Sequence, residues 1–388
     1  MNKIEKLIQE YCPDGVEYKE LGSICNIKTG KGITKKDGSD DALYPIISGG
    51  KELMGYYHEY NRLERTVTIS RVGANAGYVN YINSKFYLND KCFSIIPKEA
   101  FKDLINTKYL FYSLKRMESK IIELQSEGGV PTINIRKVSN INISLPSLLT
   151  QNKIVNILDK FIHLEEELNA ELETRRKQYD FYLNQLMGFE DSAVEWKTLG
   201  EIAEFKYGFT DKAKDKGNVR FVRITDINEY GKLRDNDYKY IDLTAENEEY
   251  ILSKGDLLMA RTGATFGKTM LFNENYPAVY ASFLIRIRFI GEIILPDYYW
   301  HFSQSSLYWN QAYELVGGGA QPQFNANALK AVKIPIPPLS EQESIVSILD
   351  KFDSLVNDTT IGIQAEIEAR RKQYAYYRNK LLTFGEYA

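Results

Sequence analysis

The stretch AELETRRKQYDFYLNQLMGF, at residues 170–189, occurs a second time as AEIEARRKQYAYYRNKLLTF at residues 365–384. The copies lie 195 residues apart and share RRKQY unchanged. Both are rich in Glu, Arg, Lys, Gln and Leu and lack Pro, so each predicts a helix. Upstream, QNKIVNILDKF at 151–161 matches QESIVSILDKF at 342–352, which is 191 residues later. Because the two offsets differ by four, we expect the second helix to be about one turn longer than the first.

Apolar and aromatic residues recur in alternating steps of three and four along both helices, which is the pattern of a coiled coil. The first stripe consists of Ile154, Leu158, Phe161, Glu165, Leu168, Leu172, Arg175, Tyr179, Tyr182 and Leu186. The second consists of Ile345, Leu349, Phe352, Val356, Thr359, Ile363, Ile367, Arg370, Tyr374, Tyr377 and Leu381. Two successive steps of four in the second stripe form a stutter, which we expect to unwind the coiled coil locally without breaking it. Neither helix can bury its stripe alone, so each is the expected partner of the other.

The segments between the helices repeat as well. Motifs recur in the same order, namely VEYKELGSI at 16–24 and VEWKTLGEI at 194–202, SRVGANAG at 70–77 and ARTGATFG at 260–267, and GGVPTIN at 128–134 and GGAQPQFN at 318–325. This shared order predicts a tandem duplication in which the loops have diverged more than the framework that the repeated motifs form. Its parts are an N-terminal helix at 1–15, a globular domain at 16–147, a helix at 148–193, a second globular domain at 194–338 and a second helix at 339–388.

The fold class expected is α+β, with two domains of mixed α and β that have mostly β cores. Short alternating runs such as TVTIS, FVRITDI and FLIRIRFI predict strands, and residues 107–125 and 296–315 predict helices. The first domain ends where the first helix begins, and the second domain joins the end of that helix to the start of the other. We therefore expect two long antiparallel helices that separate the domains, with an approximate two-fold between the halves.

Composition is that of an ordinary globular protein, with 44% hydrophobic and 26% charged residues. The start lacks the apolar segment of a signal peptide, and no apolar run approaches the length of a membrane helix. Three cysteines without CxxC spacing predict neither a disulfide framework nor a zinc site, and we expect a cytoplasmic protein. The overall charge is −3, yet residues 16–147 carry 19 basic and 14 acidic residues, a net +5. A basic first domain suits a phosphate-bearing partner, whereas residues 194–338, with 17 basic and 18 acidic residues, support this only weakly.

No catalytic centre or metal site is recognisable. The stretch RTGATFGKT at 261–269 resembles a phosphate-binding loop, but that motif requires Gly at the position of Thr262, so we interpret it as a structural turn. His58, His163 and His301 are isolated and lack metal-ligand spacing; we expect His163, beside the stripe, to be structural. Signatures of an adenine methyltransferase or a nuclease are also missing.

The repeated helical motif, together with the domain endings INISLPSL at 141–148 and VKIPIPPL at 332–339, resembles the specificity subunit of Type I restriction–modification systems. The resemblance covers essentially the whole chain. It implies two target recognition domains that each bind one part of a split sequence in double-stranded DNA, and two helices that set the spacing and recruit two methyltransferase subunits. It also implies restriction subunits, with S-adenosylmethionine, ATP and Mg bound by the partners and none by this chain, which would not be a catalyst by itself.

The resemblance places base readout in the loops of the recognition domains, where Arg and Lys can pair with guanine and Asn and Gln with adenine. In the first half the candidate DNA-binding residues are Lys28, Thr29, Lys31, Thr34, Lys35, Ser48, Lys51, Arg71, Asn75, Thr132 and Asn134. In the second half they are Lys206, Tyr207, Thr210, Arg223, Thr225, Arg261, Thr265, Lys268, Gln321, Gln323 and Asn325. For Arg71 and Arg261 a structural pairing remains as plausible as a contact with nucleic acid.

Within RRKQY, the candidate partner-binding residues are Arg175, Arg176, Lys177, Arg370, Arg371 and Lys372. A Glu-rich coiled coil favours helix pairing or docking of a partner protein over a phosphate patch. Two other classes stay open at this point: a protein-binding scaffold without a DNA role, and an enzyme with an unrecognised active site. Salt-sensitive DNA binding separates the first from a DNA reader, and activity of the purified chain alone tests the second.

Overall fold

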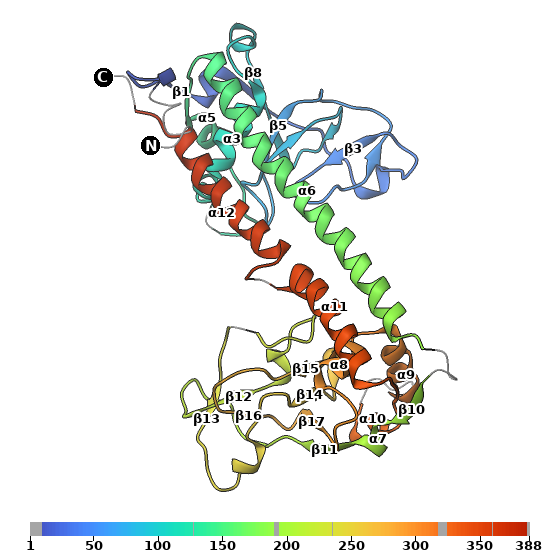
Figure 1. Cartoon of the computed structure of the whole chain (residues 1–388). Helices are drawn as coiled ribbons and strands as arrows, with labels where there is room; N and C mark the ends of the chain where they lie inside the picture. Colours follow the sequence, from blue (N-terminus) through green and yellow to red (C-terminus); the bar gives the residue numbers. More distant parts are fainter. Residues whose placement is uncertain are drawn as a thin grey trace. The chain divides into compact units, whose positions relative to one another are not determined.

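The computed structural model describes residues 10–126, 128–189, 194–234, 236–316, 324–358 and 360–385. The predicted N-terminal helix lies largely outside these residues. The chain forms two compact units (Figure 1): unit 1 comprises Met1–Glu167 and Ile367–Ala388, and unit 2 comprises Leu168–Glu366. Each unit therefore contains one globular domain together with parts of both helical segments.

Unit 1 contains three small sheets. A four-stranded antiparallel sheet has the order β2 (Cys25–Thr29), β8 (Cys92–Pro97), β5 (Thr66–Ser70) and β6 (Val79–Ile82). A three-stranded sheet has the order β4 (Tyr56–Tyr57), β3 (Tyr44–Ile47) and β7 (Tyr87–Leu88), and β1 (Tyr18–Glu20) pairs with β9 (Asn142–Ser144). Val67, Ile69 and Phe93 of the larger sheet are buried in one core with Leu110 and Leu114 of the helix α3 (Thr107–Arg116).

Unit 2 repeats this plan strand for strand. Its four-stranded sheet has the order β11 (Ala203–Tyr207), β17 (Leu284–Phe289), β14 (Leu257–Ala260) and β15 (Thr269–Leu271). Its three-stranded sheet has the order β13 (Tyr240–Ile241), β12 (Val219–Val222) and β16 (Ala278–Tyr280), and β10 (Glu195–Thr198) pairs with β18 (Lys333–Ile336). The tandem repeat and the α+β class are thus confirmed.

Short helices complete each domain. They are α2 (Leu21–Ile24), α3, α4 (Glu118–Ile122) and α5 (Ile135–Ser139) in unit 1, and α7 (Leu199–Ile202), α8 (Pro296–Phe302), α9 (Ser306–Val316) and α10 (Ala326–Lys330) in unit 2. The helices expected at 107–125 and 296–315 are present, although each is divided in two. The strand expected for FVRITDI was wrong beyond Val222: the Asp226 carboxylate accepts a hydrogen bond from the Arg223 N–H at 2.8 Å, which closes a 3₁₀ turn at Ile224–Asp226.

The first long helix, α6 (Leu148–Met187), is continuous over 40 residues, whereas the second is broken into α11 (Leu339–Asn357) and α12 (Ile363–Leu381). The continuous, longer second helix expected from the stutter was therefore wrong. The Asp358 carboxylate, at the end of α11, accepts hydrogen bonds from the Thr360 and Ile361 N–H groups at 2.7 and 3.2 Å, which stabilises the turn between the two helices. The four additional residues are absorbed by this break rather than by a helical turn, and Thr359 of the expected stripe lies outside the described residues.

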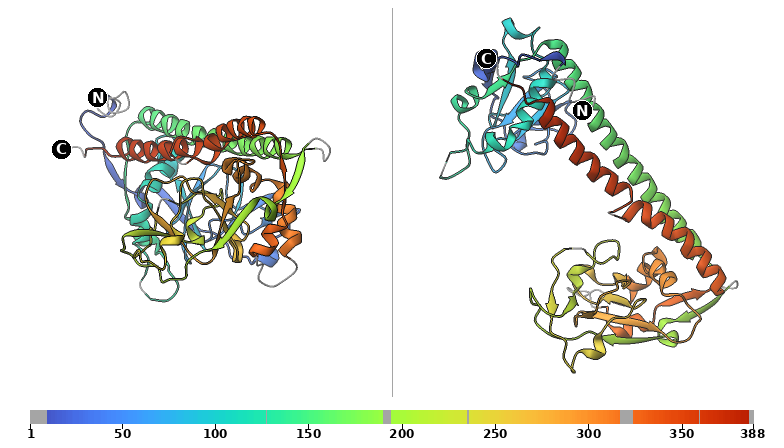
Figure 2. Two further views of the ribbon diagram at one scale, coloured as in Figure 1. Left: turned by 60° about the horizontal axis from the view of Figure 1, so that its bottom comes forward. Right: turned by 60° about the vertical axis from the view of Figure 1, so that its left-hand side comes forward.

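The helical segments pair antiparallel within each unit, as expected (Figure 2). In unit 1, Phe161 of α6 stacks on Tyr377 of α12 with ring centroids 5.6 Å apart, and further along α6 the Glu165 carboxylate accepts a hydrogen bond from Arg371 at 2.7 Å. Residues further along α6 therefore contact residues nearer the start of α12, so the two helices run antiparallel. In unit 2 the equivalent pair, Tyr182 and Phe352, stacks at 5.3 Å.

One buried glutamine joins the start of each helical segment to its domain. The Gln151 side chain donates to the carbonyls of Leu104 and Pro146 and accepts from the Asn106 N–H, at 2.8 to 2.9 Å. Gln342, at the matching place, makes the same three contacts with Ile293, Pro337 and Leu295 at 2.8 to 2.9 Å. Both side chains are fully buried, so the two domains are attached to their helices in the same way.

Candidate nucleic-acid interface

In unit 1 several loops meet where β2, β3 and β5 end and β8 begins. We call residues 29–31, 48–51, 71–75, 89–91 and 131–134 loop end 1. Main-chain hydrogen bonds hold it together: the Lys31 N–H donates to Leu88 at 3.0 Å, and the Arg71 N–H donates to Lys91 at 2.7 Å. A Cβ at Gly30 would lie 2.0 Å from the Leu88 carbonyl oxygen, so only glycine permits this approach.

Unit 2 has the matching surface, formed by residues 207–210, 223, 261–265, 281–283 and 324–326, which we call loop end 2. The Arg261 N–H donates to Phe283 at 3.1 Å, and the Phe324 N–H donates to Arg261 at 2.8 Å. Gly208 takes the place of Gly30, since a Cβ there would lie 2.2 Å from the Ala281 carbonyl oxygen. Both domains therefore gather the same loops at the same edge of their sheets.

Most of the sequence-predicted residues lie at these two ends. Loop end 1 contains Thr29, Lys31, Ser48, Lys51, Arg71, Asn75, Thr132 and Asn134, and loop end 2 contains Tyr207, Thr210, Arg223, Arg261, Thr265 and Asn325. Outside these ranges lie Lys28, Thr34, Lys35, Lys206, Thr225 and Lys268. Lys268 lines a cavity of about 300 Å³ with Arg176 and Tyr179 and so faces α6. Gln321 and Gln323 lie outside the described residues.

Several of the predicted contacts already have a role within the chain. Asn134 and Asn325 cap α5 and α10, accepting from the N–H groups of Arg136 and Ala328 at 2.9 and 3.0 Å. Thr34 caps a 3₁₀ turn through Asp37, and its hydrogen bonds lower the pKa of that carboxyl. These three side chains position the loops, which makes them poorer candidates for base contacts.

Two of the predicted cations are also paired. Arg223 donates to the Asp226 carboxylate at 2.6 Å, and this hydrogen bond raises the pKa of the guanidinium. Lys206 lies 2.7 Å from Glu249, whose pKa it lowers. DNA phosphates would have to compete with these carboxylates.

The structure adds residues that the sequence reasoning missed. Lys91 and Phe283 occupy the same position in the two domains, because each main-chain carbonyl accepts from the equivalent arginine. The side chain of Phe283 is 51% exposed, and Lys91 is also exposed. An alignment of YLNDKCF at 87–93 with VYASFLI at 279–285 places Lys91 opposite Phe283, but none of the aligned positions is identical, so the sequence did not suggest it.

The glycine-bearing stretches at 70–77 and 260–267 are turns, as interpreted from the sequence. Gly73 and Gly77 have φ of 103° and 99°, and Gly263 and Gly267 have φ of 71° and 78°. These left-handed conformations favour glycine in both copies and need no phosphate to explain them.

The RRKQY motifs are partly used inside the protein. Arg175 and Arg370 each donate to the Gln three residues later, at 2.9 and 3.0 Å. Arg176 donates to the Tyr230 hydroxyl, whereas Arg371 pairs with Glu165 across the helices. Lys177 and Lys372 are exposed. The arginines thus favour helix and domain packing, and the lysines remain accessible to a partner.

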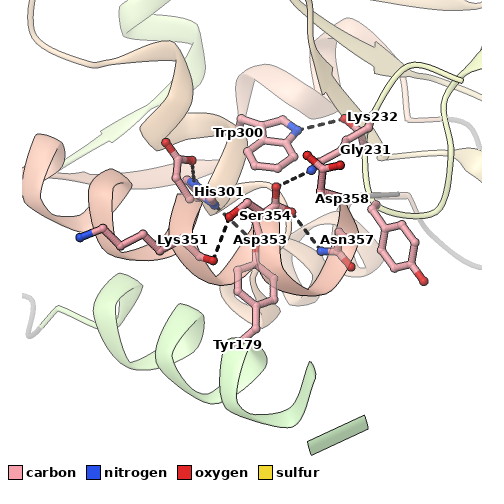
Figure 3. Close-up of polar contacts among 12 residues, drawn as sticks. Tyr179, Gly231, Lys232, Trp300, His301, Lys351, Asp353, Ser354, Asn357 and Asp358 are labelled. Carbon is pink, nitrogen blue, oxygen red and sulfur yellow. Dashed lines mark hydrogen bonds and ion pairs between the residues drawn. The ribbon is translucent and has the colours of Figure 1, made fainter. Parts of the chain in front are cut away.

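A buried polar cluster holds the loop at residues 228–234 against α11 (Figure 3). Lys232 lies 2.5 Å from the Asp353 carboxylate, which also accepts from the Asn357 amide at 3.0 Å. The Trp300 indole N–H donates to the Gly231 carbonyl at 3.1 Å. In unit 1 the position that matches Asp353 is Ile162, so this ion pair is specific to unit 2.

His301 is completely buried, with Nε2 2.8 Å from the Asp350 carboxylate and Nδ1 3.4 Å from the Tyr179 hydroxyl. Asp159, the repeat equivalent of Asp350, instead accepts from the Tyr112 hydroxyl. His163, expected to be structural, is 72% exposed and lies 3.4 Å from Glu167. Within the described ranges no group of three potential metal ligands occurs, and none of the described helices combines the length and hydrophobicity needed to cross a membrane.

Comparison with known proteins gives a consistent result. A family model described as the Type I restriction modification DNA specificity domain matches twice, at residues 13–174 and 192–369. A Type I restriction enzyme specificity subunit of Escherichia coli is 31% identical, with 99% of this chain and 97% of that protein covered. The MjaVIII specificity subunit of Methanocaldococcus jannaschii is 25% identical over 89% of this chain and 87% of that protein. The crystal structure of a Type I restriction–modification S subunit from M. genitalium shares the fold, with a TM-score of 0.61 at 18% identity over 95% of this chain and 96% of that one.

Proposed function

Because this chain belongs to the family of Type I restriction–modification DNA specificity proteins, we propose that it is the subunit that selects the DNA sequence on which such a complex acts. Loop end 1 binds one half of a bipartite target in double-stranded DNA, and loop end 2 binds the other half. The chain works in the cytoplasm and is not a catalyst by itself.

One observation carries this proposal: the two domains keep the same strands and the same glutamine anchor while the side chains at their loop ends differ. Thr29 is replaced by Tyr207, and Lys91 by Phe283. A constant frame that presents two different sets of side chains suits the reading of two different half-sequences. A single-purpose scaffold would have no need for this divergence.

The partners follow from the same proposal. Two methyltransferase subunits dock on the helical segments near the exposed Lys177 and Lys372, and restriction subunits join the methyltransferase complex. S-adenosylmethionine, ATP and Mg bind to those partners. The helical segments set the number of unspecified base pairs between the two half-sites.

Methylome sequencing of cells that express the chain with its methyltransferase tests the proposal. We expect adenine methylation in a motif with two specified halves and an unspecified gap, and none when either protein is expressed alone. Methylation without sequence preference, or methylation by this chain alone, would contradict it. In vitro, binding of the assembled complex to its motif should weaken steeply with salt, because protein cations replace counterions on phosphate.

A further inference from the structure

Arg71 and Arg261 have the same backbone setting at the two loop ends. Each follows directly on an inner strand of the four-stranded sheet of its domain, β5 or β14 (Figure 1). The Arg71 carbonyl accepts from the Ile133 N–H at 2.9 Å, and the Arg261 carbonyl accepts from the Phe324 N–H at 2.8 Å. Together with the bonds from their own N–H groups, these contacts fix both residues from two sides.

Main-chain carbonyl groups at equivalent positions orient the two arginine side chains. Arg71 donates through Nη1 to the Asp90 carbonyl, and Arg261 donates through Nε to the Ser282 carbonyl, each at 3.1 Å. Asp90 and Ser282 are equivalent, since each precedes the residue whose carbonyl accepts the arginine N–H. These bonds consume only part of the five N–H groups of a guanidinium.

Aromatic rings add a second constraint on Arg261. Its guanidinium carbon lies 5.3 Å from the Tyr207 ring centroid and 5.4 Å from that of Phe283. The Tyr207 ring is itself held, because its hydroxyl accepts from the Ala326 N–H at 3.0 Å. Tyr207 and Phe283 are 41% and 51% exposed, so the group is open to a ligand. The hydrogen bond from Arg261 to Ser282 uses Nε rather than an Nη atom.

We propose that Arg261 reads a guanine in one half-site through its O6 and N7 atoms, and that Arg71 reads a guanine at the matching place in the other half-site. The inference rests on the proposed function. An arginine whose planar fork is oriented in advance matches the two acceptors of guanine in the major groove, and it loses little entropy on binding. Tyr207 and Phe283 are positioning residues that hold the guanidinium of Arg261 in its orientation. Arg71 has one such ring, because its guanidinium carbon lies 5.9 Å from the ring centroid of the buried Phe93.

The first test is Arg261→Lys in the chain expressed with its methyltransferase, with Arg71→Lys as the matched variant. Lysine keeps the charge and can still donate to guanine, but its flexible ammonium lacks the planar fork. We expect one guanine in one half of the methylated motif to be specified less strictly in Arg261→Lys, and one guanine in the other half in Arg71→Lys. An unchanged motif in either variant would overturn the proposal for that residue.

The second test uses the wild-type chain assembled with its methyltransferase, so it does not depend on a variant that folds. Each guanine of the motif is replaced in turn by 7-deazaguanine, which lacks the N7 acceptor. One guanine in each half should show binding weakened about tenfold, within the range of a bidentate base contact. Arg261→Lys should reduce this sensitivity in one half only. Absence of a sensitive guanine, or equal weakening of binding to every sequence by Arg261→Lys, would indicate a phosphate contact and refute base reading.

Positioning is tested separately with Phe283→Ala and Phe283→Tyr. The alanine variant should discriminate less between guanine and other bases at the Arg261 position, with the other half-site unchanged, and tyrosine should restore discrimination. Equal discrimination by all three proteins would show that the ring has no such role. If the wild-type complex had no bipartite motif, the proposed function itself would fail, whereas a motif that contains no responsive guanine would defeat this inference alone.

Discussion

Replacing Lys232 with Met should destabilise unit 2, because it leaves the Asp353 carboxylate without its cation. The Asp353 side chain is only 9% exposed, and that of Lys232 is 31% exposed. Removal of one partner of a fully buried ion pair costs about 3–5 kcal/mol. Here the remaining hydrogen bond from Asn357 and the partial exposure reduce the expected loss to about 2–3 kcal/mol.

Tryptophan fluorescence during urea unfolding measures this effect selectively. All three tryptophans, Trp196, Trp300 and Trp309, belong to unit 2, and Trp300 donates to Gly231 beside Lys232. The matched control is Lys351→Met, which removes an exposed lysine from α11, the helix that carries Asp353, and should change stability by less than about 0.5 kcal/mol. Adding Asp353→Asn to Lys232→Met should recover part of the lost stability, since the buried charge is removed while an acceptor for the Asn357 amide remains. If Lys232→Met were no more destabilising than the control, the ion pair would not hold the loop.

Three further predictions follow from burial and from the helices. Alkylation of the native chain followed by mass spectrometry should modify Cys12 before Cys25 and Cys92, because burial raises the pKa of the latter two thiols to about 12 and about 11; equal labelling would contradict this. Asp297→Asn should stabilise the chain at pH 7, because burial raises the pKa of this carboxyl in the folded state; its charged form therefore opposes folding, and the gain should shrink as the pH falls toward the ordinary carboxyl value of 3.8. Urea unfolding at pH 7 and pH 4 checks that sign, and a gain that grows at low pH would refute it. Inserting four residues after Leu168 should lengthen α6 by about 6 Å with a net rotation of roughly 40°; methylome sequencing should then show one to two additional unspecified base pairs and unchanged half-sites, and an active variant with the original gap would count against spacing by the helices.

The repeat could be predicted from the sequence because the residues that attach the helices to the domains are identical in the two copies. The glutamines of QNKIVNILDKF and QESIVSILDKF prove to be fully buried and identically bonded, and the aromatic residues of the two stripes stack in equivalent pairs. Periodicity also located the strands β5 and β17 and the paired helices. These features depend on local pattern or on residue identity, both of which a single sequence carries.

Other features depend on contacts between distant segments and were missed. The turn between α11 and α12 contains hydrogen bonds from the Thr360 and Ile361 N–H groups to the Asp358 carboxylate, and the spacing of the apolar residues does not distinguish such a turn from a stutter in a continuous helix. His301 and Asp353 find their partners only when the domain folds against the helices. Phe283 was likewise missed, because it becomes part of loop end 2 only through a main-chain hydrogen bond from Arg261.

Some of the candidate DNA-binding residues lie where a ligand can reach them, whereas others hold the loops in place. Arg71 and Arg261 could be chosen because both halves keep an arginine beside a repeated glycine turn, and the structure gives them the same setting. Asn134 and Asn325 were chosen on the same grounds and are helix caps. Repetition marks a constrained position, but it does not distinguish a residue that holds a loop from a residue that the loop presents.

The most direct test of the account is the exchange of residues 16–147 for the matching domain of a relative with a different target. The hybrid chain would be expressed with its methyltransferase, and its methylated motif would be read by methylome sequencing. We predict that one half of the motif changes to that of the relative while the other half stays as in the parent chain. A hybrid that methylates DNA with both halves changed, or with neither changed, would contradict independent reading by the two domains.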